Sequence, residues 1–153
     1  MVRTAPLESI RSFLVAIDGT QAATNALAGA CEIARRSRAD VSVIHVIEVP
    51  RSLPLDAELM EELESGEVIL GDAEQLAGRY DVKLDARILQ ARNAGAAIVD
   101  EAVALQPDAI VLGLDYHRPY GRFELGVLPL YVLENASAQV WLIRYPPDSV
   151  SPS

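Results

Sequence analysis

The chain has 153 residues, half of them hydrophobic, with 22 acidic and 13 basic residues and a formal net charge of −9 at pH 7. This length is typical of one domain, the acidic balance does not suit the phosphates of nucleic acid, and no apolar run approaches the roughly 18 residues of a membrane-spanning helix. We therefore expect a soluble, cytoplasmic domain that binds neither nucleic acid nor a membrane.

The first two predicted strands flank an alanine-rich helix. The apolar run FLVAI at 13–17 predicts a buried strand that ends in the turn Asp-Gly-Thr. A helix is expected over 22–37, because its apolar residues recur on one face, and Thr20 is a suitable N-cap for it. The run VSVIHVIEV at 41–49 predicts the second strand, which two prolines terminate.

The next helix is expected from an N-cap at Asp56 to about residue 79. Gly66 and Gly71 fall inside it, and each costs about 1 kcal/mol relative to alanine, so these are the places where the helix is most prone to break. Eight acids and no base lie between residues 52 and 78. We interpret the acidic segment, residues 56–74, as the solvated face of this helix.

Alternation of apolar and charged residues predicts a third strand over 82–88. Asn93 is then expected to cap a helix that runs to about residue 105. A further continuous apolar run, AIVLGL at 109–114, predicts another strand that is buried on both faces.

The last third of the chain ends in a short helix and a strand. A polar loop over 115–125 precedes the helix expected at 126–135, where Pro129 lies close enough to the start to be tolerated. The final strand is expected at 139–144. A strand this apolar at the edge of a sheet needs a cover, which favours self-association.

Five strands that alternate with four helices predict one α/β domain over residues 11–145, between flexible segments at 1–10 and 146–153. Strands separated by helices form a parallel sheet with helices on both faces. The commonest arrangement is a doubly wound five-stranded sheet in the order 3-2-1-4-5. Ligands bind such sheets where the order reverses, which places the turn at 18–20 opposite the segment 113–127.

Several well-known catalytic and nucleotide-binding motifs are missing from the sequence. It has no Walker P-loop, no glycine fingerprint for dinucleotides after the first strand and no nucleophile elbow. We interpret His45 as a core side chain, His117 as a solvated loop residue and Cys31, the only cysteine, as a buried and inert thiol. Without a metal-ligand cluster, an activated nucleophile or a paired general base, we do not expect an enzyme.

Four segments of the chain resemble the universal stress protein family: FLVAIDGT, the helix end IARRS, the strand end HVIE and the strand start IVLG. The resemblance covers about residues 11–145. It implies the sheet order given above and a homodimer formed through the last strand, residues 139–144. It also implies that Asp18 and Val46 contact the adenosine part of a nucleotide, as the matching residues do in nucleotide-binding members.

Those nucleotide-binding members carry a motif of Gly, two residues, Gly, nine residues, Gly and then Ser or Thr. Gly113 and Gly126 match its first and third glycines with the family's spacing, whereas Tyr116 and Val127 stand at the other two positions. The segment leads to a helix N-terminus, where backbone N–H groups bind anions and glycine permits close approach to a phosphate. The resemblance therefore implies that the two glycines belong to a phosphate loop. The residues alone are equally consistent with turns, one at the helix entry for Asp18 and one at the strand end for the glycines.

The departures from the motif weaken this predicted phosphate site. Tyr116 adds bulk, Val127 keeps its N–H but lacks a hydroxyl, and Pro129 removes another N–H from the helix start. A hydrogen bond to a charged group contributes about 1.5–3 kcal/mol, so two lost bonds weaken binding by about 100-fold or more. Arg118 and Arg122 either replace these donors, because arginine suits phosphate geometry, or form a solvated basic loop.

We therefore expect a homodimeric regulatory module of the stress response that acts through unknown protein partners. It requires no cofactor and binds nucleotide weakly or not at all. The alternative is an ATP- or AMP-binding protein that uses Asp18, Gly113, Gly126 and the loop arginines. A slow ATPase is a third interpretation, which no catalytic group in the sequence favours.

Overall fold

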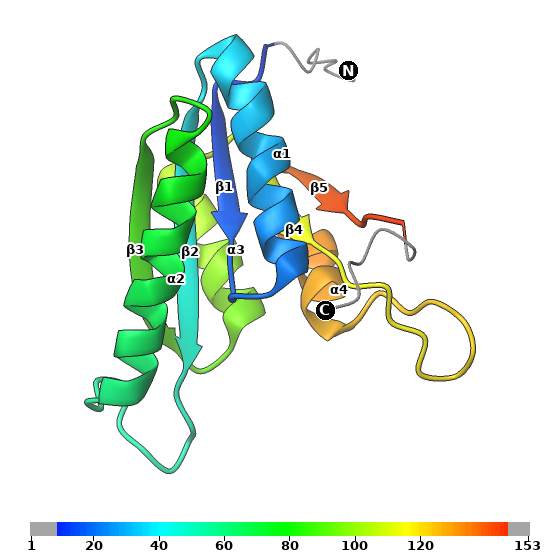
Figure 1. Cartoon of the computed structure of the whole chain (residues 1–153). Helices are drawn as coiled ribbons and strands as arrows, with labels where there is room; N and C mark the ends of the chain where they lie inside the picture. Colours follow the sequence, from blue (N-terminus) through cyan, green and yellow to red (C-terminus); the bar gives the residue numbers. More distant parts are fainter. Residues whose placement is uncertain (1–8, 147–153) are drawn as a thin grey trace.

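The structure is a computed structural model that describes residues 9–146 (Figure 1). Within these residues, five strands form one parallel sheet in the order β3-β2-β1-β4-β5, which confirms the predicted doubly wound α/β fold. The strands are β1 (Ser12–Ala16), β2 (Asp40–Glu48), β3 (Leu84–Ala91), β4 (Ala109–Gly113) and β5 (Gln139–Ile143). The helices are α1 (Gln21–Ser37), α2 (Met60–Gly78), α3 (Ala94–Leu105) and α4 (Val127–Asn135).

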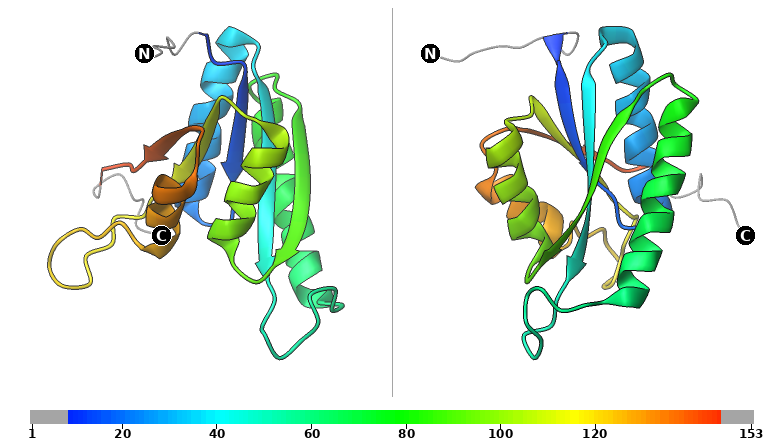
Figure 2. Two further views of the ribbon diagram at one scale, coloured as in Figure 1. Left: turned by 180° about the vertical axis from the view of Figure 1, so that it is seen from behind. Right: turned by 90° about the vertical axis from the view of Figure 1, so that its left-hand side faces the viewer.

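Two helices cover each face of the sheet, as the edge-on view shows (Figure 2). α1 and α2 pack on the face to which Phe13 and Val15 of β1 point, whereas α3 and α4 pack on the face of Leu14. Each of these three side chains is at most 1% exposed. Successive residues of a strand point to opposite faces, so a continuously apolar strand must be covered on both. The apolar runs of the sequence therefore identify the interior strands.

Local capping signals determine where two of the helices begin. The Oγ1 atom of Thr20 accepts a hydrogen bond from the N–H of Ala23 at 3.2 Å, at the start of α1. The Oδ1 atom of Asn93 accepts one from the N–H of Ala96 at 2.9 Å, at the start of α3. Both caps are those that the sequence predicts, because a capping side chain needs only the residues that follow it.

The start of α2 differs from the prediction. Its N-cap is Leu59, whose side chain makes no capping hydrogen bond, and the expected cap, Asp56, lies in the preceding loop. The side chains of Gln90 and Arg92 donate hydrogen bonds to backbone carbonyls within residues 50–57. These contacts with a distant part of the chain hold the loop in a non-helical path, so the predicted cap is wrong.

α2 runs unbroken through both glycines that the sequence marks as weak points. Gly66 is buried, and a Cβ atom there would lie 3.0 Å from side-chain carbons of His45 and Ile88. The glycine thus lets α2 approach the sheet closely, and this packing offsets its low helix propensity. His45 is half-buried with its Nδ1 atom 2.9 Å from the backbone oxygen of Ile17, as expected of a core histidine.

The third strand is longer than predicted at its carboxyl end. β3 begins at Leu84 and continues past residue 88 to Ala91, because β2 stays paired with it as far as Glu48. The strand therefore reaches the end of the sheet where ligands bind in this fold. Its last residues carry the Gln90 side chain that holds the loop before α2.

The two expected flexible ends lie mostly outside the described residues. Among the described ones, Ile10 is 2% exposed and packs in the same core as Phe13, so the packed domain includes residue 10. Between residues 9 and 146, no helix combines the length and the apolar character that a membrane span requires.

Candidate functional site

The turn after β1 lies at the point where the strand order reverses, between β1 and β4. The Oδ1 atom of Asp18 accepts hydrogen bonds from the backbone N–H of Thr20 at 3.0 Å and from its hydroxyl at 2.6 Å. The same hydroxyl oxygen caps α1. Asp18 is exposed, and its Oδ2 atom accepts no hydrogen bond from the residues that the structure describes. The cap therefore orients a carboxylate that keeps one oxygen available.

A cleft of about 90 Å³ opens beside this turn, between the ends of three strands and the two helices α3 and α4. Its lining is mostly apolar and consists of Ala16, Ile17, Asp18, Ala23, Ile44, Val46, Ala94, Ile98, Leu112, Gly113 and Leu128. Pockets that bind small molecules typically have about 300–1,000 Å³. The cleft has the chemistry of a binding site at the expected position, but it is narrower than a bound nucleotide requires.

Three of the predicted site residues, Asp18, Val46 and Gly113, line this cleft together. Gly113 has a structural role in addition, because a Cβ atom there would lie 2.0 Å from the backbone oxygen of Ala22. No side chain fits at that distance, so β4 can approach the first turn of α1 only with glycine at position 113. The fold requires this glycine whether or not a nucleotide binds.

Gly126 serves a different purpose from Gly113. It is the N-cap of α4 and has φ +87°, a left-handed conformation that favours glycine, while the space around its Cβ position is open apart from Pro129 at 3.8 Å. The helix that follows begins without a side-chain cap. Val127 is 84% exposed and lies outside the cleft lining, so its N–H is a donor on the helix end rather than in the cleft.

The loop between β4 and α4 folds onto itself and projects from the body of the domain (Figure 1). The rings of Tyr116 and Phe123 stack at 5.9 Å between centroids, and the guanidinium of Arg144 lies 4.8 Å from the first ring and 5.3 Å from the second. The backbone N–H of Glu124 donates to the oxygen of His117 at 3.0 Å. Tyr116 is therefore fixed by an aromatic and cationic stack.

The two loop arginines are not brought into the cleft. The Arg118 guanidinium donates a hydrogen bond to the backbone oxygen of Gly121 and lies 5.7 Å from the Tyr116 ring. Arg122 is exposed and makes no hydrogen bond or ion pair with the described residues. Neither side chain lines the cleft. Arg118 is therefore engaged within the loop, whereas Arg122 is available for a ligand but lies outside the cleft lining.

Sequence reasoning missed the role of Arg144. This residue follows β5 directly, and its partners, Tyr116 and Phe123, lie more than 20 positions earlier in the chain. The cation and its ring partners meet because β4 and β5 are neighbouring parallel strands whose carboxyl ends coincide. Only the sheet order, combined with the loop's fold, would have indicated this contact.

Two further residues behave as predicted. Burial raises the pKa of the Cys31 thiol to about 11, so the thiol stays neutral and unreactive near neutral pH. His117 lies exposed on the projecting loop. Among residues 9–146, no three histidine, cysteine or acidic side chains gather as a metal site would require.

Comparisons with known proteins match nearly the whole described chain. The model of the family described as the universal stress protein family matches residues 9–144. A universal stress protein of Methanocaldococcus jannaschii, MJ0531, is 28% identical over an alignment of 142 residues, and the match covers 89% of this chain and 83% of that protein. The sequence match therefore extends over both the cleft and the projecting loop.

Solved structures match the fold. One universal stress protein from Archaeoglobus fulgidus has a TM-score of 0.73 at 22% identity and covers 86% of this chain and 97% of its own. A structure of the universal stress protein from the same organism in complex with dAMP has a TM-score of 0.68 at 19% identity, with coverages of 86% and 96%. These likenesses confirm the arrangement of strands and helices.

Proposed function

The chain belongs to the universal stress protein family, and from this premise we propose that it is a cytoplasmic, homodimeric module of stress regulation rather than an enzyme. It acts through protein partners. It binds adenine nucleotides weakly, mainly by their adenosine part, and it requires no metal or other cofactor.

The cleft supports the adenosine part of this proposal. Its apolar walls suit a purine ring, and the available oxygen of Asp18 suits the hydroxyl groups of a ribose. A structure similar in fold was solved with dAMP. The cleft of about 90 Å³ must widen to admit a nucleoside, and the free energy of this opening reduces the affinity.

The stack of Tyr116, Phe123 and Arg144 is the observation that carries the proposal of weak binding. The stacked rings belong to the loop that would have to surround phosphates, and the Arg144 guanidinium lies against these rings. Arg118 is engaged within the same loop. Phosphate groups would therefore gain few hydrogen bonds, and the affinity for a nucleotide is set by its nucleoside.

A calorimetric titration of the full chain with adenosine, AMP, ADP and ATP, with and without magnesium, tests this proposal. We expect dissociation constants that agree within about threefold, because additional phosphates find no additional donors. The variant Asp18→Asn should weaken all four ligands alike. ATP binding that is about 100-fold tighter than adenosine binding would contradict the proposal.

The second candidate is an ATP- or AMP-binding protein whose phosphate site uses Arg122. The observation that favours it is the exposed position of Arg122, whose guanidinium makes no hydrogen bond or ion pair within residues 9–146. In this case Arg122→Ala would lower the affinity for ATP by about tenfold or more and leave the affinity for adenosine unchanged. The matched variant Arg118→Ala would lose contacts within the loop, namely the hydrogen bond to Gly121 and the approach to the Tyr116 ring, and should leave ATP binding unchanged.

The proposed dimer uses the β5 edge of the sheet together with α4. β5 pairs on one side with β4, and α4 beside it exposes Leu130 and Leu133, at 48% and 42%. An apolar surface next to an open strand edge favours self-association. Trp141 is unsuitable for a test, because its ring packs against Phe13 at 5.2 Å between centroids and a charge there would disturb the core.

Light scattering of the double variant Leu130→Glu/Leu133→Glu tests the dimer. We expect the wild type to have the mass of two chains and the variant that of one. The control is Val103→Glu on α3. This apolar side chain is also exposed, at 61%, but it lies on α3 and outside the proposed interface. A dimer that persists in the double variant, or a monomeric wild type, would contradict this interface.

A further inference from the structure

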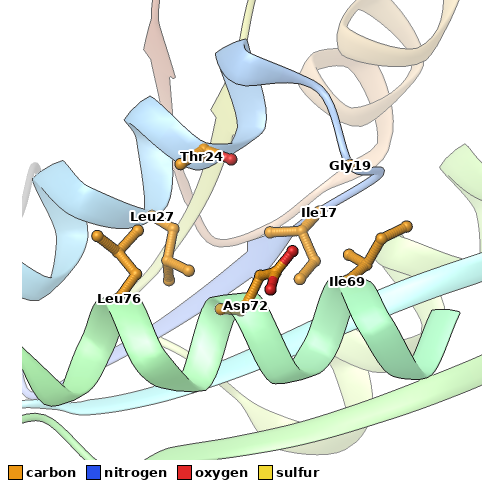
Figure 3. A pocket seen from close by; sticks show the side chains of 8 residues that line it. Ile17, Gly19, Thr24, Leu27, Ile69, Asp72 and Leu76 are labelled. Carbon is orange, nitrogen blue, oxygen red and sulfur yellow. The ribbon is translucent and has the colours of Figure 1, made fainter. Parts of the chain in front are cut away.

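A second cavity, of about 120 Å³, lies on the opposite face of the sheet from the cleft (Figure 3). It is situated between α1 and α2 at the carboxyl end of β1 and is lined by Ile17, Gly19, Thr24, Leu27, Ile69, Asp72, Ala73 and Leu76. Its floor is buried, since Leu27 is 1% and Ala73 5% exposed. The cavity thus combines an apolar interior with an opening to solvent.

Only two side chains at the mouth of this cavity are polar. In Figure 3 the carboxylate of Asp72 points from α2 into the space between the two helices, with Thr24 on the facing side of α1. The Thr24 hydroxyl donates its hydrogen to the backbone oxygen of Thr20 at 3.1 Å, so it can only accept a further bond. The two side chains of the rim therefore offer acceptors and no donor.

Asp72 has no partner in the part of the chain that the structure describes. Its side chain is exposed, its carboxylate accepts no hydrogen bond from residues 9–146, and the ion pairs of these residues involve other side chains. No lysine or arginine occurs in the sequence from residue 52 to residue 78, so no cation of its own helix competes for it. A negative charge without a partner at the mouth of an apolar cavity suits a ligand with a positive head and a hydrocarbon body.

We propose that this cavity binds a small primary alkylammonium, with the alkyl chain between α1 and α2 and the ammonium group on Asp72. A cavity of about 150 Å³ holds a benzene molecule, so one of about 120 Å³ holds a chain of roughly four carbon atoms. The three hydrogens of the ammonium group match the acceptors of Asp72 and Thr24. This site is separate from the proposed nucleotide site, because the two spaces lie on opposite faces of the sheet and share only Ile17 in their linings.

The binding experiment uses the full chain with labelled isoleucine methyl groups and n-butylammonium as the probe. We expect saturable shifts of the Ile69 methyl signal, because Ile69 lines this cavity, and none of Ile98, which lines only the cleft. The neutral isostere n-butanol should bind at least about tenfold more weakly, and butyrate should not bind. Shifts centred on Ile98, equal binding of butanol, or no shift at roughly 50 mM butylammonium would overturn the proposal.

Two variants separate this site from general attraction of cations to an acidic helix. Asp72→Asn keeps the shape of the side chain and should lower the affinity for butylammonium by about tenfold. The matched control, Glu74→Gln, removes one charge two residues further along the same helix. Its side chain is exposed like that of Asp72 but does not line the cavity, so this variant should leave binding unchanged. Equal losses in both variants, or wild-type binding by Asp72→Asn, would show that no site exists at Asp72.

Discussion

Gly113 illustrates how one residue can match a binding motif for a reason of packing. Its spacing from Gly126 is that of a phosphate loop, yet its Cβ position collides with the backbone of Ala22 at the start of α1. The two residues lie far apart in the sequence, so this clash cannot be predicted from the motif. The role of Gly113 in binding a phosphate stays a prediction, whereas the fold supplies a packing role that holds without a ligand.

The two glycines should respond differently to alanine. Gly113→Ala places a Cβ atom against backbone that cannot move, so we expect it to reduce the free energy of unfolding by at least about 3 kcal/mol. The Cβ atom of Gly126→Ala makes only an ordinary contact with Pro129 at 3.8 Å, but the residue must keep a positive φ, so we expect a loss of about 1–2 kcal/mol. Urea denaturation of the two variants without nucleotide measures both values. Equal and small losses would contradict the packing role of Gly113.

Cys31 makes the stability dependent on pH in the alkaline range. Burial raises its pKa from 9.0 to about 11, so the unfolded chain loses the thiol proton at a lower pH than the folded protein does. The neutral thiol therefore costs no stability below about pH 9. As the pH rises from 9 towards 11, the free energy of unfolding falls by at most about 2–3 kcal/mol. Denaturation of wild type and Cys31→Ala from pH 8 to 11 should show a steeper loss in the wild type; parallel curves would refute it.

At the scale of elements, the sequence predicts those boundaries that depend on neighbouring residues. The caps Thr20 and Asn93 act on the N–H groups three positions ahead, and both predictions are correct. The start of α2 depends instead on Gln90 and Arg92, which hold the loop before it from β3. A prediction from local signals placed that cap at Asp56, because no local signal reports a contact with a strand formed later in the chain.

The two caps provide a matched pair for linking helix stability to the cleft. Thr20→Ala and Asn93→Ala should each lower the free energy of unfolding by about 1 kcal/mol in chemical denaturation. Of the two caps, only the Thr20 hydroxyl also donates a hydrogen bond to the carboxylate of Asp18, at 2.6 Å. Only Thr20→Ala should therefore lower the affinity for adenosine that calorimetry measures. Thr20→Ser should restore both properties. An equal effect of both alanine variants on adenosine would contradict the coupling.

At the scale of the molecule, the order of the sheet could be predicted because three strands are apolar on both faces and helices separate all five. The site could be predicted only in part. Asp18, Val46 and Gly113 meet because strand ends converge at the reversal of the order, which topology determines. The positions of Arg118 and Arg122 depend on the fold of a long loop, which Arg144 fixes from another strand, and no periodicity in the sequence encodes that contact.

The uneven charge of the molecule predicts that salt stabilises it. No base lies between residues 52 and 78, and on α2 the acids Glu61, Glu64 and Glu67 follow one another at a spacing of three residues, where like charges are unfavourable. The midpoint of thermal unfolding should therefore rise by about 2–5 °C when salt increases from low concentration to roughly 0.5 M. The triple glutamine variant of Glu61, Glu64 and Glu67 should lose most of this rise, whereas amide substitutions of the scattered acids Asp40, Glu124 and Glu134 should retain it.

Ile17 lines both the cleft and the cavity between α1 and α2, so one residue forms part of the wall between two ligand spaces. A change in its position caused by an occupant on one side alters the shape of the other side. Thermodynamic reciprocity then requires that an amine which changes the affinity for a nucleoside has its own affinity changed by the same factor. With such a shared wall, the occupancy of each site would depend on the concentrations of both small molecules rather than on one of them alone.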